Sequence, residues 1–219
     1  QISCRLIITR GGKRIIAVLD AGEFKRIIEN TKKFVRKEAR NDLMSWIYME
    51  IDAKEMTIKA TALDGRRVST ESAGLTEADE SFVCFIRPEI PKVSRYDAYA
   101  ELEVNENRLF VRVGESIAGY VQPEGTFYDV SKVLEPLREK EKMAVIGMNA
   151  KYLKEAMESI SAYGGSKMCR IEVYGPLQPI VIRSGRKGER ENVIIVLPID
   201  LRDCNSMSHR LSQKGASRL

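Results

Sequence analysis

The stretch RIIAVLDAGEFKRIIENTKKFV, residues 14–35, opens as a strand and continues as a helix. Residues 14–19 form a short, largely apolar run, and Asp20 follows with a side chain suited to cap a helix N-terminus. The spacing then predicts a helix over residues 22–38 with two opposite faces. The apolar face consists of Phe24, Ile27, Ile28, Phe34 and Val35, and the basic face of Lys25, Lys32, Lys33, Arg36 and Arg40.

Three segments with alternating apolar residues follow this helix. They predict strands at residues 46–52, 55–62 and 67–71. Asp64-Gly65 lies between the last two and is the strongest short hairpin signal in the chain. The order is therefore strand, helix and three strands.

The same order returns twice. The second copy has a strand at 82–86, a proline-containing segment at 88–97 with room for at most two helical turns, and strands at 99–104, 108–113 and 116–122. The third has a strand at 143–147, a helix at 149–162 and strands at 168–174, 180–183 and 192–197. Asn149 should cap this helix, with Leu153, Ala156, Met157 and Ile160 facing inward. The sequence thus predicts three βαβββ units of about 60 residues each.

The composition indicates a globular, mildly basic protein. Lys and Arg number 36 against 31 Asp and Glu, and 43% of the residues are hydrophobic. The apolar runs are too short to span a bilayer, and we expect a cytoplasmic protein without a signal peptide. The four cysteines form no C-x-x-C pair, which favours reduced thiols over a metal site.

The enzyme and metal-site signals are weak. The single histidine, His209, lies in a polar tail, and we find no phosphate-binding loop, nucleophile elbow or zinc-protease motif. Glu50, Asp52 and Glu55 are expected to be solvent-facing residues of the strands. The sequence therefore predicts a protein that is not an enzyme and needs no cofactor or metal.

The basic helix face has two interpretations. Exposed Lys and Arg at helical spacing attract nucleic-acid phosphates without sequence preference. The alternative is an ordinary solvated face, diluted by Glu23, Glu29 and Glu38. Residues 202–219 are also basic and are expected to form a disordered tail.

Five short segments carry a further signal, in this order: ATALDGRRV (60–68), EGTFYDVSKVL (124–134), MNAKYL (148–153), GPLQPIVIR (175–183) and VLPI (196–199). They resemble signatures of the bacterial sliding clamps, the beta subunits of DNA polymerase III, which read approximately A-T-D-G-x-R-L, G-x-F-P-D-Y-x-x-V-L-P, F-N-x-x-Y-L, G-P-L-S-P and M-P-x-R-L. The resemblance spans residues 14–200.

The resemblance implies an α+β, DNA-clamp-like fold of repeated βαβββ units, with helices on one face of antiparallel sheets. Clamps of this family form rings whose helices face duplex DNA and bind it without reading bases. The residues that would then contact phosphates are Lys25, Lys32, Lys33, Arg36, Arg40, Lys92, Arg95, Lys151 and Lys154.

The family also binds DNA polymerase and other proteins through a pocket that takes a short peptide with apolar anchors. By resemblance, the pocket residues here are Gly65, Arg66, Arg67, Val68, Tyr128, Lys132, Val133, Asn149, Tyr152, Leu177, Pro179, Val196, Leu197, Pro198 and Ile199. Ordinary core packing is the alternative for each apolar member.

The match leaves a gap in the family pattern. Residues 1–136 resemble one whole clamp domain, residues 137–201 only the second half of another, and residues 202–219 form the added tail. A lone half-domain leaves a sheet edge unpaired, so we expect self-association through the third unit.

The function expected from the resemblance is a sliding-clamp-like processivity factor that encircles or cradles DNA and tethers polymerase. The alternative is an adaptor that binds clamp-interacting peptides without encircling DNA.

Overall fold

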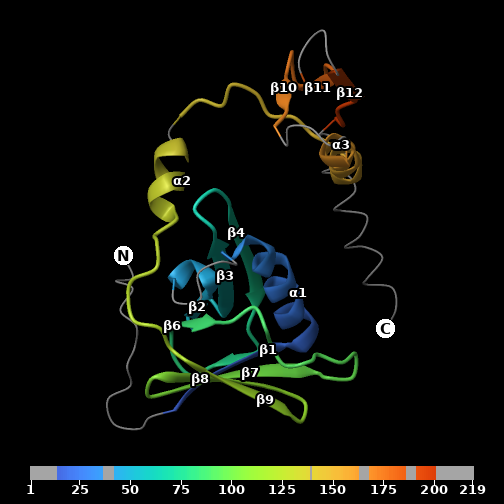
Figure 1. Ribbon diagram of the computed structural model, residues 1–219. Helices are drawn as coiled ribbons and strands as arrows, with labels where there is room; N and C mark the ends of the chain where they lie inside the picture. Colours follow the sequence, from blue (N-terminus) through green and yellow to red (C-terminus); the bar gives the residue numbers. More distant parts are fainter. Residues whose placement is uncertain (1–13, 37–41, 139, 163–167, 186–190, 201–219) are drawn as a thin grey trace, which may run out of the picture. The chain divides into compact units, whose positions relative to one another are not determined.

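The computed structural model describes residues 14–36, 42–138, 140–162, 168–185 and 191–200 (Figure 1). The chain divides into two compact units, residues 1–130 and residues 131–219. Each unit is described by itself. Arg40 and the predicted tail at 202–219 lie outside the described residues.

Unit 1 contains two successive halves. The first half consists of β1 (Ile15–Asp20), α1 (Ala21–Thr31), the 3₁₀ turns η1 (Lys32–Phe34) and η2 (Leu43–Ser45), β2 (Ile47–Asp52), β3 (Thr57–Leu63), β4 (Val68–Gly74) and β5 (Glu77–Ala78). The second half consists of β6 (Phe82–Ile86), β7 (Tyr99–Asn105), β8 (Arg108–Val113) and β9 (Ser116–Val121). Apart from the short β5, every strand of unit 1 was predicted to within three residues.

The two halves exchange their first strands. β1 pairs with β7 in a five-stranded sheet of order β5-β1-β7-β8-β9. β6 in turn pairs with β2 in a four-stranded sheet of order β4-β3-β2-β6. All these pairs are antiparallel. Each half therefore completes the sheet of the other.

Helix α1 packs against strands of both sheets, including β4 and β3 of one and β1 and β7 of the other (Figure 1). Its Phe24, Ile27 and Ile28 are fully buried, as the periodicity predicted. The Asp20 carboxylate accepts the Glu23 N–H at 2.9 Å and caps the helix. This geometry leaves the opposite side of α1 to its charged residues.

The predicted helix over residues 22–38 is too long. The α-helix ends at Thr31, and Lys32–Phe34 form a tighter 3₁₀ turn before Val35 becomes extended. The buried Thr31 hydroxyl donates to the Ile27 carbonyl at 2.7 Å, and the Arg36 N–H donates to Met44 instead of continuing the helix. Arg36 therefore lies beyond the helix on which it was predicted.

The segment between β6 and β7 forms no helix. Pro88 and Pro91 each lack an N–H and disfavour helical backbone in the residue before them, which explains the irregular path. A single turn at Ser94–Asp97 interrupts it, with the Asp97 carboxylate accepting the Ser94 N–H at 2.6 Å. The second half of unit 1 thus contributes strands without a helix.

Gln122 connects the two sheets of unit 1. Its buried side-chain amide accepts the Phe85 N–H at 2.7 Å and donates to the Phe85 carbonyl at 3.0 Å. Phe85 lies on β6, whereas Gln122 directly follows β9. The amide acts as a one-residue strand along the free edge of β6.

We expect Gln122→Ala to destabilise unit 1 by about 2–4 kcal/mol, because it leaves a buried donor and acceptor on Phe85 unpaired. Urea unfolding followed by the fluorescence of Trp46, the single tryptophan of the chain, measures this unit directly. Gln178→Ala, which truncates an exposed glutamine of unit 2, is the control and should leave the midpoint unchanged. Equal stability of the two variants would contradict the assigned role.

Unit 2 consists of α2 (Ser131–Arg138), α3 (Ala150–Ala162) and a three-stranded antiparallel sheet of β10 (Arg170–Glu172), β11 (Ile180–Gly185) and β12 (Glu191–Val196). Asn149 caps α3 as predicted, accepting the Lys151 N–H at 2.9 Å. Ala156 and Ile160 of α3 pack with Ile180, Ile182 and Val196 of the sheet. This small core joins one helix to one face of the sheet.

The predicted strand at 143–147 is wrong in its extent. Among the described residues, only Gly147 makes a bridge, to Ile199, and the rest of the segment pairs with no strand. A strand needs a neighbour, and in unit 1 the corresponding strand obtains its main partner from the other half.

No helix in the described part of the chain is long and apolar enough to cross a membrane.

Candidate nucleic-acid interface

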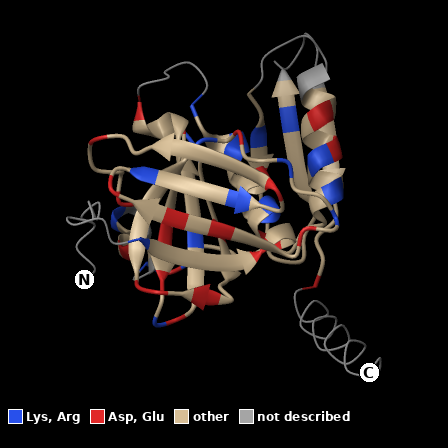
Figure 2. Cartoon of the chain, turned by 90° about the horizontal axis from the view of Figure 1, so that it is seen from below, with Lys and Arg blue, Asp and Glu red and all other residues tan. Residues whose placement is uncertain are grey.

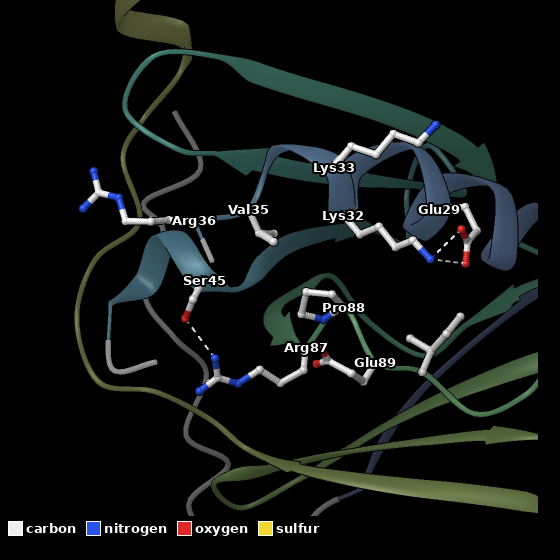
Figure 3. A pocket seen from close by; sticks show the side chains of 10 residues that line it. Glu29, Lys32, Lys33, Val35, Arg36, Ser45, Arg87, Pro88 and Glu89 are labelled. Carbon is white, nitrogen blue, oxygen red and sulfur yellow. Dashed lines mark hydrogen bonds and ion pairs between the residues drawn. The ribbon is translucent and has the colours of Figure 1, made fainter. Parts of the chain in front are cut away.

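A pocket of about 1030 Å³ lies at the C-terminal end of α1 in unit 1 (Figure 3). It is lined by Glu29, Lys32, Lys33, Val35, Arg36, Ser45, Arg87, Pro88, Glu89 and Ile90. Four of these residues are cations and two are carboxylates. The pocket therefore presents a net positive lining above a partly apolar wall of Val35, Pro88 and Ile90.

Arg87 is held in place within this pocket. Its Nη1 donates to the Ser45 hydroxyl at 2.8 Å, and its guanidinium carbon lies 3.7 Å from the centroid of the Trp46 ring. Figure 3 shows the side chain turned toward Ser45. A guanidinium fixed over an aromatic face keeps its charge while losing little freedom on binding an anion.

Two other cations of the pocket are neutralised by carboxylates. Lys32 Nζ lies 2.6 Å from Glu29, and Figure 3 shows this side chain extending along the helix to reach it. Arg36 pairs with Asp42 at 2.8 Å and also donates to the Asp64 carbonyl at 3.3 Å. Arg36 thus ties the end of α1 to the β3–β4 hairpin, in addition to its place in the pocket lining.

On α1 and the 3₁₀ turn after it, Lys25 and Lys33 are the cations available to bind an anion. Both side chains are exposed, and neither forms an ion pair with a described residue. Lys25 lies on α1 and Lys33 on the 3₁₀ turn that follows. These two ammonium groups can meet phosphates without first breaking an internal contact.

The hairpin between β3 and β4 turns at Asp64-Gly65, as predicted. The Asp64 carboxylate accepts the N–H groups of Arg66 and Arg67, both at 2.9 Å, and the Arg67 side chain at 2.7 Å. Gly65 has a φ of +87°, which disfavours a side chain. Arg67 also stacks over Phe34, 5.2 Å from the ring centroid, and so joins the hairpin to the end of α1.

The Arg67 side chain, together with the two backbone donors, lowers the pKa of Asp64 to about 2. The contribution of Asp64 to stability is therefore complete above its ordinary pKa of 3.8 and is lost as the pH falls toward 2. We expect Arg67→Ala to raise the titration midpoint of the Asp64 carboxyl group, measured by NMR of the carboxyl carbon. Arg66→Ala should not, because Arg66 contributes its backbone N–H. An Asp64 midpoint near 3.8 in the unmodified protein would contradict this.

The remaining predicted DNA contacts are dispersed. Lys92 and Arg95 are exposed on the irregular segment after β6, where Arg95 stacks on Tyr96 at 4.6 Å. Lys151 and Lys154 lie on α3 in unit 2 and approach Glu155 and Glu158 at 3.9 and 3.6 Å. Such exposed i,i+4 pairs are weak and leave both lysines available to a stronger anion.

Five predicted peptide-pocket residues belong to unit 1. Arg66, Val68 and Tyr128 are exposed there, whereas Gly65 and Arg67 build the turn described above. The pocket beside α1 is lined by none of the fifteen predicted residues.

The other ten belong to unit 2. Tyr152, Leu177 and Leu197 are exposed. They are therefore the apolar candidates best placed to contact a partner. Val196 is buried among Ile180 and Ile182, as the core-packing alternative expects, and its role in a peptide pocket stays a prediction. The side-chain carbonyl of Asn149 accepts the hydrogen bond that caps α3. The others are Lys132, Val133, Pro179, Pro198 and Ile199; the side chain of Val133 lies outside the described set.

The far side of the five-stranded sheet is electrostatically mixed. Figure 2 looks at this side, which faces away from α1, and acidic bands lie beside basic ones. Arg112 pairs with Glu101 at 2.8 Å and with the buried Glu103 at 3.1 Å. The available positive charge of unit 1 is therefore better developed beside α1 than on this sheet face.

The described residues contain no cluster of metal-ligating side chains. Glu50 pairs with Lys59 at 2.9 Å, and the Asp52 carboxylate accepts the N–H groups of Lys54 and Glu55 in the β2–β3 turn. Glu55 is exposed, as predicted, whereas Glu50 and Asp52 are partly buried and have these surface partners.

Sequence reasoning missed Arg87, Ser45 and Trp46. The signal that could have found them is the arginine directly after the predicted strand at 82–86, opposite the tryptophan that begins the predicted strand at 46–52. Recognising it requires the β2–β6 pairing, in which Ile47 lies opposite Ile86 and the two flanking residues meet.

Two interlocked antiparallel sheets with exchanged first strands define the DNA-clamp fold, and the chain has this α+β, clamp-like architecture. It is similar to the DNA polymerase III beta chain of Streptococcus pneumoniae, with a TM-score of 0.69 and 14% identity over 91% of this chain and 53% of that one. For the sliding clamp of Bacillus subtilis, the TM-score is 0.66 and the identity 14%, over 90% of this chain and 52% of that one. For the sliding clamp of Pseudomonas aeruginosa, the TM-score is 0.68 and the identity 13%, over 86% of this chain and 52% of that one.

The chain spans about half the length of these solved structures. No family model matches the sequence, and no curated protein matches it. The likeness therefore establishes the fold of the chain and confirms the expected resemblance to sliding clamps.

Proposed function

We propose that this protein is a non-enzymatic, sliding-clamp-like processivity factor that assembles around duplex DNA. The observation that carries the proposal is the basic surface of α1 and the 3₁₀ turn after it, within a clamp fold: Lys25 is exposed on the helix, and exposed Lys33 on the turn belongs to a positively lined pocket. Phosphates bound by a few such cations hold the protein close while allowing it to slide. The protein would move along duplex DNA without recognising particular bases.

The same proposal assigns a tethering role to the peptide-pocket residues. DNA polymerase and other clamp-binding proteins would place apolar anchors against Tyr152, Leu177 and Leu197 of unit 2, and Lys132 of the same unit is a polar candidate in the family pattern. An apolar surface with a few polar groups suits a short linear peptide. The exposure of these three side chains supports this assignment.

Duplex binding by the intact chain tests the proposal. Two fluorescent duplexes of unrelated sequence should bind with dissociation constants within about threefold of each other, and log affinity should fall linearly with log salt. A slope steeper than about −1.8, the value for two phosphate contacts, is expected. A tenfold preference for one sequence, or no binding at low salt, would overturn it.

The second candidate is an adaptor that binds clamp-interacting peptides without encircling DNA. The observation in its favour is that Tyr152, Leu177 and Leu197 are exposed, whereas two predicted DNA contacts, Lys32 and Arg36, are already paired with Glu29 and Asp42. An adaptor should bind peptides fully while its DNA affinity stays insensitive to Lys33→Glu. A clamp should lose DNA affinity in that variant.

A further inference from the structure

Unit 1 provides a template for how one half of this fold is completed. Each half donates its first strand to the sheet of the other half, as β1 pairs with β7 and β6 pairs with β2. The β1 strand is also held by its own half, because the Thr76 N–H donates to the Val18 carbonyl at 2.7 Å. A complete first strand therefore has one neighbour from each half.

Unit 2 reproduces a single half. Its Ile199 N–H donates to the Gly147 carbonyl at 2.9 Å, as Thr76 does to Val18. Gly147 and Val18 each lie three residues before their helices, which begin at Ala150 and Ala21. Residues 143–147 thus occupy the place of β1, with the neighbour from their own half already present.

Among the described residues of unit 2, neither residues 143–147 nor β10 has the neighbour that the other half supplies in unit 1. Within the described residues of unit 2, β10 pairs with β11 alone, whereas its counterpart β2 also pairs with β6. Ile171 of β10 is 53% exposed, although Met49 at the matching place in β2 is fully buried. Ile146 and Met148 already pack on the core of unit 2, as alternate residues of β1 do in unit 1.

We propose that two copies of this chain complete each other's unit 2, with residues 143–147 of each copy pairing antiparallel with β10 of its partner. The described part of one chain carries both a strand segment and a sheet edge without the partner seen in unit 1, so a second copy related by a two-fold axis satisfies both at once. This specifies the self-association expected from the sequence and does not depend on the proposed DNA function.

The register follows from unit 1. There Ala17 lies opposite Leu102, and Met49 lies opposite Cys84. Transferring these pairs to unit 2 places Ile146 opposite Ile171, and Met148 opposite the exposed, free Cys169 of the other copy. Backbone groups alternate along a strand, and Gly147 points to Ile199, so Ala144 and Ile146 point to the open edge.

Light scattering of the intact chain at tens of micromolar should give twice the chain mass of 24.8 kDa. Ala144→Pro removes an N–H from the open edge and should raise the dimer dissociation constant roughly 10-fold or more, since the change acts twice in a symmetric dimer. Val145→Pro is the matched control, because the N–H that it removes points to the other side of the strand. A monomer, or an equal effect of the two prolines, would overturn the proposal.

A thiol cross-link tests the register without weakening the interface. Met148→Cys should form a disulfide dimer with Cys169 of the other copy under mild oxidation, and adding Cys169→Ser should abolish it. Ala144→Cys, four residues or about 13 Å along the strand, is the control. Cross-linking of Ala144→Cys as fast as Met148→Cys, or none in Met148→Cys, would overturn the register and the strand exchange.

Discussion

Reversing the charges of Lys25 and Lys33 together should weaken binding to duplex DNA by on the order of 10- to 100-fold at low salt. Both side chains are exposed, and neither is held by a described carboxylate, so the change removes attraction without breaking an internal pair. The slope of log affinity against log salt should fall in magnitude by about 1.8, since two phosphate contacts are lost. Fluorescence anisotropy over a salt series measures both quantities.

The control for this experiment is Lys59→Glu with Arg108→Glu, which changes the net charge equally. Lys59 and Arg108 alternate with buried residues on β3 and β8, and so lie on sheet faces turned away from the core. The control should retain most of the affinity. A loss equal to that of the Lys25 and Lys33 variant would show that only total charge matters and would contradict the assignment of this surface.

Removing two exposed apolar side chains from unit 2 should strongly weaken peptide binding. Tyr152 and Leu177 are 55% and 58% exposed, so Tyr152→Ala with Leu177→Ala costs little packing in the free protein. Their loss should weaken binding by at least about 30-fold if they are the anchors of the pocket, because a few aromatic and aliphatic contacts dominate such sites. The measurement is anisotropy with short fluorescent peptides that carry leucine and phenylalanine anchors.

A matched control exists in the same unit. Tyr174→Ala with Ile195→Ala removes a tyrosine and an aliphatic side chain of similar exposure outside the predicted pocket. It should leave peptide affinity unchanged, and neither double variant should alter DNA affinity. Equal loss in the two double variants would instead indicate nonspecific adhesion to the apolar surface of unit 2.

Local chemistry made much of the fold predictable. Alternating apolar residues located the strands of unit 1, Asp64-Gly65 located the hairpin, and Asp20 and Asn149 located the helix starts. Each of these signals is contained within a few neighbouring residues. The end of α1 was less predictable, since it depends on the Arg36 N–H donating to the carbonyl of Met44, which lies further along the chain.

Long-range pairing explains what sequence reasoning missed. Nothing in residues 14–20 shows that this strand pairs with β7 of the other half, and an apolar segment such as 143–147 becomes a strand only beside a partner. The pocket at α1 likewise depends on Arg87 meeting Ser45 and Trp46 across the β2–β6 pair. The DNA and peptide assignments came from the clamp resemblance, and both stay predictions.

Retention on DNA circles separates a clamp from every alternative considered above. The intact protein would be incubated with a nicked circular plasmid, passed through a gel-filtration column at moderate salt, and compared with the same plasmid linearised beforehand. A protein that encircles the duplex should elute with the circle and be lost from the linear DNA, since open ends release a sliding ring. Equal retention on both forms, or retention on neither, would contradict the proposed function.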